Sequence, residues 1–263
     1  MTAQGLVDGV TGFVRSLLEL LGRFVLLAAL LLRGAVRRRW AAGELWRQMY
    51  HVGNRSALFV MVTLGFIGMV LVFQTCLQIN RVTGDLSQVG AEFAKILVHE
   101  FGPSLTAMML ATRVGAGIAA EVGSMVVTEQ VDALAMCGVE PVEYLLAPRF
   151  TATLLMTGLL TVFGVAAALG MGALTAYQSF HVSPDVFFNF SKVQYGDLLT
   201  GGIKCLCYGG AIPLVSGFCG FATSGGSEGV GWATTRAVVA SSFVVIVLDF
   251  LISGVAMFTL QAG

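Results

Sequence analysis

The chain has 263 residues, of which 56% are hydrophobic and 11% are charged, whereas about a quarter of the residues in an ordinary soluble domain are charged. Its 15 basic and 15 acidic side chains cancel to a formal charge of zero, so the total charge gives no reason to expect a nucleic-acid partner. This composition excludes an ordinary soluble domain and predicts an integral membrane protein.

The N-terminal region predicts a helix with two unlike faces. Residues 11–33 combine a broad apolar face with Arg15, Glu19 and Arg23 at four-residue spacing opposite, a pattern typical of helices that lie in the membrane interface. Because residues 24–32 are apolar all round, a short or partial crossing stays open as an alternative. The first ten residues carry no basic side chain, so we expect insertion without a cleaved signal peptide.

An arginine-rich segment overlaps the end of this helix and continues beyond it. It holds the densest positive cluster in the sequence: Arg33, Arg37, Arg38, Arg39, Arg47 and Arg55. By the positive-inside rule such a cluster faces the cytoplasm, which predicts a cytoplasmic N-terminus. We therefore divide the chain into an N-terminal segment, residues 1–56, and a membrane domain, residues 57–263.

Five blocks that are mostly apolar follow, each long enough to cross a bilayer as a helix of about 20 residues. They cover residues 57–79, 96–120, 150–177, 198–222 and 238–260. The predicted fold is all-α, with five transmembrane helices after the interfacial helix. Small residues at four-residue spacing predict close helix packing: Ala111, Gly115 and Ala119; Ala116 and Ala120; Ala166 and Gly170; Ala168 and Gly172.

With the N-terminus inside, the connections between the blocks alternate between the two sides of the membrane. Residues 80–95 and 178–197 then face outward, and residues 121–149 and 223–237 face the cytoplasm. The segment 121–149 is acidic and gives the positive-inside rule no support, but the arginine cluster outweighs it. Within this segment, residues 127–136 predict a short amphipathic helix between spans 2 and 3.

Ionisable residues lie inside the predicted spans, where each charge is costly unless it is paired or hydrated. Glu100 directly precedes a Phe-Gly-Pro sequence, where proline removes a backbone hydrogen bond and favours a kink. This arrangement indicates either a cavity wall or a structural ion pair, for example with Lys204. Asp249 is interpreted as a structural partner, and Arg113 is expected to snorkel or to pair with an acidic group.

Motifs for catalysis and for metal binding are missing from the sequence. There is no GxxxxGK[ST] phosphate loop, no HExxH and no GxSxG, and the three histidines are not at metal-ligand spacing. We therefore predict no catalytic residue, no metal site and no cofactor. The chain is not expected to hydrolyse ATP itself.

Six short blocks stand out along the membrane domain. The longest is ATRVGAGIAAEVGSMVVTEQVDAL at 111–134, and the others are GFIGMV at 65–70, HEFGP at 99–103, GVEP at 138–141, APR at 147–149 and ATTRAVVAS at 233–241. Taken in chain order, these blocks resemble the MlaE/YrbE family of lipid-transport permeases. The resemblance covers about residues 45–260, and the length of the central block makes it specific.

The resemblance implies the permease subunit of an ABC transporter. Such a permease is a homodimer in the bacterial inner membrane. It moves phospholipids to or from a periplasmic MCE-domain lipid carrier and maintains outer-membrane lipid asymmetry. A separate cytoplasmic ATPase subunit binds the segment after the second span, the coupling helix. This assigns the ATPase contact to Glu121, Glu129, Gln130 and Asp132, and we expect their acidic excess to meet basic residues of the ATPase.

The resemblance also implies a lipid-binding cavity at the dimer interface, formed by the first, second and fifth spans. Glu100 matches the acidic member of a polar pair before the Gly-Pro, and Gln74 matches a polar position in the first span. His99 departs from the arginine expected in that pair. A histidine is mostly neutral at pH 7 and lacks the bidentate fork of arginine. This departure weakens the expectation of a lipid-phosphate contact at His99.

Two other functions compete with the transport subunit. A membrane scaffold would anchor a complex without enclosing a substrate, and the charged and kink-forming residues inside the spans argue against it. A proton-driven secondary carrier would use Glu100 and Asp249 and would need no ATPase. The match to the coupling helix argues against this carrier.

Overall fold

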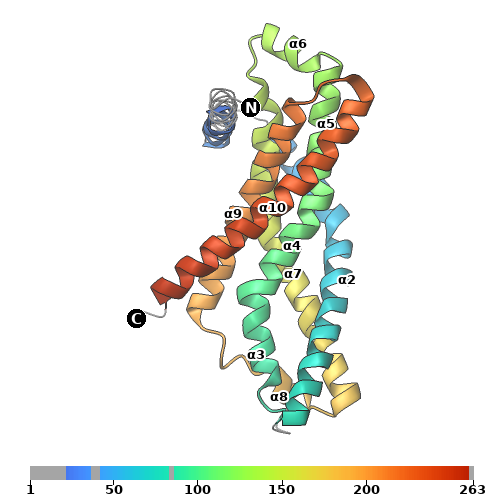
Figure 1. Cartoon of the computed structure of the whole chain (residues 1–263), viewed down its shortest axis with the longest axis vertical. Coiled ribbons are helices and arrows are strands. Elements are labelled where there is room, and N and C mark those ends of the chain that lie inside the picture. Colours follow the sequence, from blue (N-terminus) through green and yellow to red (C-terminus); the bar gives the residue numbers. More distant parts are fainter. Residues whose placement is uncertain (1–21, 37–41, 83–85, 261–263) are drawn as a thin grey trace, which may run out of the picture.

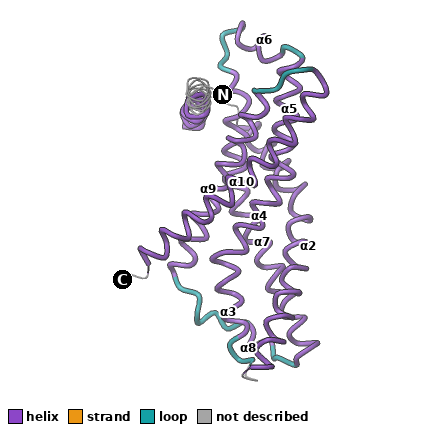
Figure 2. Tube along the Cα trace, viewed as in Figure 1, coloured by secondary structure: helices purple, strands orange, loops and turns teal. Residues whose placement is uncertain are grey.

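The computed structural model describes residues 22–36, 42–82 and 86–260, and in these ranges the protein consists of helices and short connections without any strand (Figures 1 and 2). The elements after the first helix are α2 (Ala42–Val82), α3 (Val89–Ile96), η1 (Leu97–Phe101), α4 (Gly102–Leu110), η2 (Ala111–Gly115), α5 (Ala116–Val127), α6 (Gln130–Met136), η3 (Val142–Leu146), α7 (Ala147–Phe180), α8 (Pro184–Phe187), α9 (Tyr195–Phe221) and α10 (Gly226–Leu260). The three η elements are single π-helical turns within longer helices.

The five predicted spans are confirmed. The described residues contain five helical stretches long and apolar enough to cross a membrane: Gly43–Arg81, Val89–Val127, Val142–Phe180, Tyr195–Phe221 and Gly226–Phe258. Four of the five begin well before the apolar blocks, because polar residues outside the hydrocarbon can continue a helix whose apolar part fixes it in the bilayer. The expected boundary between residues 56 and 57 therefore falls inside α2.

Two connections are much shorter than predicted. The expected loop 223–237 is wrong, because α10 begins at Gly226 and the turn before it is made by Gly225 and Gly226 at positive φ. The acidic segment 121–149 is also mostly helical: α5 continues to Val127, and the helix of span 3 begins at Val142. Hydrophobicity alone missed these helix ends, because polar residues in water form helices as readily as apolar ones.

Short elements mark the two ends of the bundle. Figure 1 shows α6 at one end and α8 at the opposite end, with the long helices running between them. The predicted short helix between spans 2 and 3 is therefore present as α6. This arrangement places the α5–α7 and α9–α10 connections together and the α2–α3 and α7–α9 connections together.

Helices α2 and α7 pack along most of their length. A Cβ atom on Gly68 would lie 2.5 Å from the carbonyl oxygen of Ala168, so only glycine permits this approach. Of the small residues singled out in the sequence, Ala111, Gly115, Ala119, Ala168 and Gly172 are buried, whereas Ala166 and Gly170 are exposed on α7. The prediction of a packed interior is thus correct for two of the four groups and wrong for the Ala166–Gly170 pair, while Ala116 and Ala120 are half-buried.

The N-terminal helix, residues 22–36, packs against the end of the bundle that carries α6. Leu27 and Leu31 are buried in a cluster with Ile118, Val122 and Leu146. Figure 1 shows this helix nearly end-on, so its axis runs across the long helices. This orientation agrees with the interfacial helix predicted for this region. The first half of the predicted helix and Arg37–Arg39 lie outside the described residues.

Candidate functional site

A network of charged and polar side chains lies inside the bundle, centred on Lys204 of α9. The Lys204 side chain is fully buried, and its Nζ forms ion pairs with Glu100 of η1 and, at 2.9 Å, with Asp249 of α10. His99 Nδ1 lies 3.2 Å from the other Glu100 oxygen. The structure therefore brings together four residues singled out in the sequence, from three different spans.

Three hydroxyl groups complete the network. Tyr208 donates to Asp249 at 2.6 Å, Ser104 donates to the same carboxylate at 2.9 Å, and Ser253 donates to Glu100 at 2.9 Å. The sequence analysis missed all three. A signal was available, because each hydroxyl follows one of the ionisable residues by four positions: Ser104 after Glu100, Tyr208 after Lys204 and Ser253 after Asp249. This spacing places both side chains on one helix face.

Glu100 is positioned by a local widening of its helix. The residues before Pro103 form the π-helical turn η1, in which the N–H of Gly102 bonds to the carbonyl of Leu97, five residues earlier. Proline cannot donate the ordinary helical hydrogen bond, and π-helical turns are frequent at functional sites. The helix thus widens beside the proline. Glu100 lies about three turns after the beginning of α3 at Val89.

The network combines a buried cation with accessible anions. In the single chain the side chain of Lys204 is 0% exposed, whereas those of Glu100 and Asp249 are 36% and 29% exposed. Two carboxylates around one ammonium leave negative charge on the exposed side of the network. Such a site can attract a polar or cationic group at membrane depth. Among the described residues no set of three or more His, Cys, Asp or Glu side chains is arranged to hold a metal ion.

The structure leaves two predicted residues outside this network. Gln74 is exposed on α2, and no hydrogen bond joins it to Glu100 or His99 in the described part of the chain. Arg113 is exposed on η2 and lines a cavity near the α6 end of the bundle instead. Neither residue is held in place by the charges around Lys204.

The short helix α6 carries the residues assigned to the ATPase contact. Glu129, Gln130 and Asp132 are all exposed, and α6 has no buried residue. Glu129 precedes the helix with φ at 59°, a left-handed conformation that costs a non-glycine residue about 1–2 kcal/mol. The result is a sharp turn after α5 that presents α6 at the end of the molecule (Figure 1).

Glu121 lies apart from this surface. It belongs to α5, and its carboxylate forms an ion pair of 2.7 Å with Arg149 at the start of α7. The Arg149 side chain is 10% exposed and that of Glu121 is 64% exposed. Glu121 thus joins spans 2 and 3 rather than standing with Glu129 and Asp132 on α6.

Comparison with known proteins covers the part of the chain that contains the Lys204 network and α6. Residues 45–255 match the family Permease MlaE, and this range includes nearly all of α2, every element from α3 to α9 and most of α10. The chain belongs to the MlaE permease family. Members of this family are transport subunits rather than enzymes, so this MlaE-family chain is a multi-pass membrane permease.

Individual relatives agree with the MlaE family match. The chain is 34% identical over 225 residues to a probable ABC transporter permease protein of Synechocystis, covering 85% of this chain and 84% of the relative. It is 33% identical over 240 residues to the intermembrane phospholipid transport system permease protein MlaE of Haemophilus influenzae, covering 89% and 91%. It is also 30% identical over 230 residues to the chloroplastic protein TRIGALACTOSYLDIACYLGLYCEROL 1 of Arabidopsis thaliana, covering 85% and 65%.

Proposed function

We propose that this permease moves phospholipids between the inner membrane and a periplasmic MCE-domain lipid carrier and so maintains outer-membrane lipid asymmetry. The observation that carries the proposal is the family match over residues 45–255, together with similarity to an intermembrane phospholipid transport permease over most of both chains. ATP hydrolysis takes place in a separate ATPase subunit.

The ATPase contact is assigned to the α6 end of the molecule. Gln130 and Asp132 stand on the exposed short helix α6, and Glu129 makes the sharp turn directly before it. Acidic side chains at the rim of an interface steer a basic partner and set specificity. Glu121 contributes by fixing the start of α7 to α5 through its ion pair with Arg149. Because α6 follows α5, a displacement of α6 is then transmitted through this ion pair to span 3.

The lipid site is assigned to the exposed side of the Lys204 network. His99 and Glu100 contact lipid there, and Gln74 faces the same cavity from α2 in the assembled transporter. Only 11% of the most apolar part of α10 is buried in the single chain, which supports a homodimer that encloses the cavity. Lys204 and Asp249 form an intramembrane charge pair beside this site, and Arg113 is a further intramembrane charge nearer the α6 end.

The orientation follows from the charges. The N-terminus and α6 lie on the cytoplasmic side, and α8 faces the periplasm. We keep the division into an N-terminal segment, residues 1–56, and a membrane domain, residues 57–263, with α2 continuing through the boundary. The described part of the N-terminal helix lies across the spans at the α6 end (Figure 1), as a helix in the cytoplasmic interface would.

Co-purification tests this proposal. The detergent-solubilised protein is captured with its native neighbours, and proteins and retained lipids are identified by mass spectrometry. We compare the wild type with Glu129→Lys/Asp132→Lys and with Asp185→Lys, a charge reversal at an exposed residue of α8. The wild type and Asp185→Lys should retain an ATPase and a phospholipid. The double variant should lose the ATPase and keep the lipid.

Other outcomes have definite meanings. If the folded wild type is purified without any ATPase, the ABC assignment is wrong and proton-driven transport through Glu100 and Asp249 becomes the next hypothesis. If Asp185→Lys loses the ATPase as completely as the double variant, the contact does not lie on α6.

A further inference from the structure

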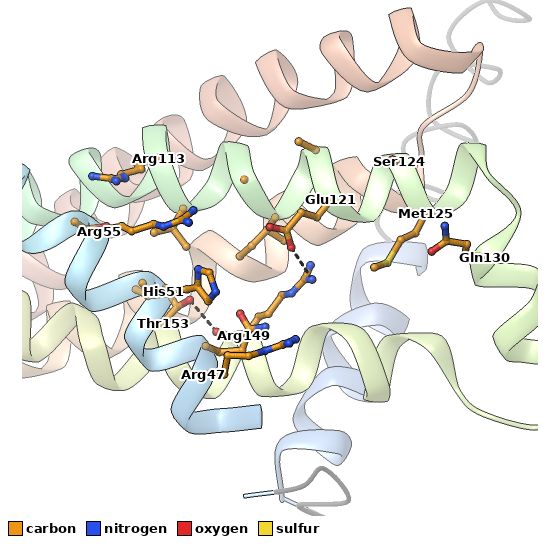
Figure 3. Close-up of a pocket in the computed structure, with 17 residues that line it drawn as sticks. Arg47, His51, Arg55, Arg113, Glu121, Ser124, Met125, Gln130, Arg149 and Thr153 are labelled. Carbon is orange, nitrogen blue, oxygen red and sulfur yellow. Dashed lines mark hydrogen bonds and ion pairs between the residues drawn. The ribbon is translucent and has the colours of Figure 1, made fainter. Parts of the chain in front are cut away.

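A polar cavity separate from the Lys204 network lies at the α6 end of the bundle. It is bounded by α5 and by the first turns of α2 and α7 (Figure 3). Its volume is about 760 Å³, within the usual range of roughly 300–1,000 Å³ for ligand pockets. Four arginines and one carboxylate line it, and none of its residues belongs to the Lys204 network: the charged set is Arg47, Arg55, Arg113, Arg149 and Glu121.

The sequence builds one wall of this cavity with a simple spacing. Arg47, His51 and Arg55 follow one another at intervals of four residues on α2, so they share one helix face. Opposite them, Gly117 of α5 leaves room, because a Cβ atom there would meet no other atom within 4 Å. In Figure 3 these α2 side chains and Arg149 point into the space between the helices.

Positive charge in the cavity is only partly balanced. Arg149 pairs with Glu121 at 2.7 Å, and Arg47 pairs with Glu44 at 3.1 Å. Arg55 and Arg113 form no ion pair within the described residues. A cavity lined by guanidinium groups with too few counter-charges has a positive potential, so the cavity favours an anion.

Two buried polar atoms also lack a partner there. Arg149 is 8% exposed and Ser56 is 1% exposed, and both line the cavity. The Nη1 atom of Arg149 and the Oγ atom of Ser56 form no hydrogen bond to any described residue. Buried donors are nearly always satisfied in native proteins, so these two atoms indicate acceptors that the described residues do not supply.

We propose that this cavity binds a phosphate group, carried by a phospholipid headgroup or by free inorganic phosphate. Arginine is the side chain best suited to this task, because its planar fork donates two parallel hydrogen bonds to phosphate oxygens. Ser56 supplies a further donor at the same wall. Arg113 lies about 20 Å along the helix from the end of α5, so the cavity extends along span 2, and a headgroup can enter it from the adjacent leaflet.

The test compares lipids that differ in the phosphate. Purified, delipidated full-length protein in detergent is titrated by native mass spectrometry with phosphatidylglycerol and with monogalactosyldiacylglycerol, which has galactose in place of the phosphate headgroup. Inorganic phosphate is titrated separately by calorimetry. The variant Arg55→Gln/Arg113→Gln removes the two unpaired arginines, and Arg81→Gln/Arg236→Gln removes two exposed arginines that do not line this cavity. Arg149→Lys keeps the charge and removes the fork.

We expect Arg55→Gln/Arg113→Gln to weaken phosphatidylglycerol binding by at least about tenfold, since each lost charge-assisted bond is worth that factor or more. Arg149→Lys should also weaken phosphatidylglycerol binding. The control variant, Arg81→Gln/Arg236→Gln, should bind phosphatidylglycerol within about twofold of the wild type. Binding of the galactolipid should be the same for all variants. If inorganic phosphate binds with the same arginine dependence and phosphatidylglycerol does not bind, the site belongs to free phosphate.

The proposal is overturned if neither phosphatidylglycerol nor inorganic phosphate binds in an arginine-dependent way, or if the galactolipid shows the same dependence. It is also overturned if Arg55→Gln/Arg113→Gln binds phosphatidylglycerol and inorganic phosphate like the wild type but loses the ATPase in the co-purification described above, because the cavity would then receive an acidic side chain of that partner. Each variant is compared by melting temperature and gel filtration first. These outcomes leave the co-purification test of α6 unaffected, since Arg55 and Arg113 lie outside α6.

Discussion

At the scale of single residues, Lys204 is the most deeply buried charged residue in the described part of the chain. It is fully buried and touches two carboxylates from different spans. The ion pairs repay part of the cost of removing these charges from water, but they do so only while all three groups are present. The network therefore holds spans 2, 4 and 5 in one arrangement.

Removing the cation alone should be severe. Lys204→Met leaves Glu100 and Asp249 without their cation, and the loss of one partner of a buried pair costs about 3–5 kcal/mol. At roughly 2–4 °C per kcal/mol for a protein of this size, the melting temperature in detergent should fall by at least about 6 °C. Differential scanning fluorimetry measures this shift.

The matched control is Lys192→Met. Lys192 also pairs with a carboxylate, Glu92, at 2.7 Å, but both side chains are more than one-third exposed. An exposed pair contributes about 1 kcal/mol or less, so this variant should melt close to the wild type. If the melting temperature of Lys204→Met falls as little as that of Lys192→Met, the Lys204 network has no structural role.

At the scale of the helices, irregular turns place the side chains of both candidate sites. The π-helical turn η1 carries His99 and Glu100, and the π-helical turn η2 carries Arg113. A regular helix would rotate the residues after each turn onto a different face. Close helix contacts then fix the remaining positions, above all between α2 and α7.

Gly68 is a position where adding one methyl group should move α2 away from α7. In Gly68→Ala the new Cβ would lie 2.5 Å from the backbone oxygen of Ala168, so the α2–α7 contact must open. Overpacking of this kind costs about 1–3 kcal/mol. We expect a lower melting temperature by the same fluorimetric measurement.

Gly170→Ala on α7 provides the control. A Cβ atom there meets no other atom within 4 Å, and alanine is favoured over glycine in a helix by about 1 kcal/mol. The melting temperature should stay the same or rise. If Gly68→Ala behaved in the same way, α2 and α7 would not be in the close contact described above.

At the scale of the whole molecule, the bundle has two unlike ends. The end with α6 carries the arginine-lined cavity and the crossing helix 22–36, whereas the end with α8 carries neither (Figure 1). The proposed direction of the chain in the membrane places the first of these ends in the cytoplasm. This orientation can be tested with a cysteine that the protein already has.

Cys137 is exposed and free, and it directly follows α6. A maleimide that cannot cross membranes should therefore label it in inverted inner-membrane vesicles and not in right-side-out vesicles. Cys76 and Cys205 are buried, and Cys207 and Cys219 lie within the α9 span, so they should give little background. Mass spectrometry of the labelled peptide gives the site.

The control places a thiol at the other end. In Cys137→Ser/Ser183→Cys the only new thiol lies at an exposed residue next to α8. Its labelling should follow the opposite pattern, in right-side-out vesicles alone. Labelling of Cys137 from outside would invert the proposed orientation, and the ATPase contact on α6 would have to be abandoned.

The sequence by itself determined the class of the protein, its five spans, the short helix between spans 2 and 3 and the family resemblance. These properties depend on local hydrophobicity and on contiguous residues, which a single chain displays directly. It also singled out Glu100, Lys204 and Asp249, because a charge in an apolar block is visible without knowing its partner.

Only the tertiary structure decided which of these charges meet. Lys204 contacts both Glu100 and Asp249, although 104 residues separate the first pair in sequence. Glu121 joins Arg149 rather than the surface of α6, and the arginines of α2 meet Arg113 and Arg149 around one cavity. Such contacts depend on how the helices pack and rotate against one another, and hydrophobic patterns along one chain do not specify this.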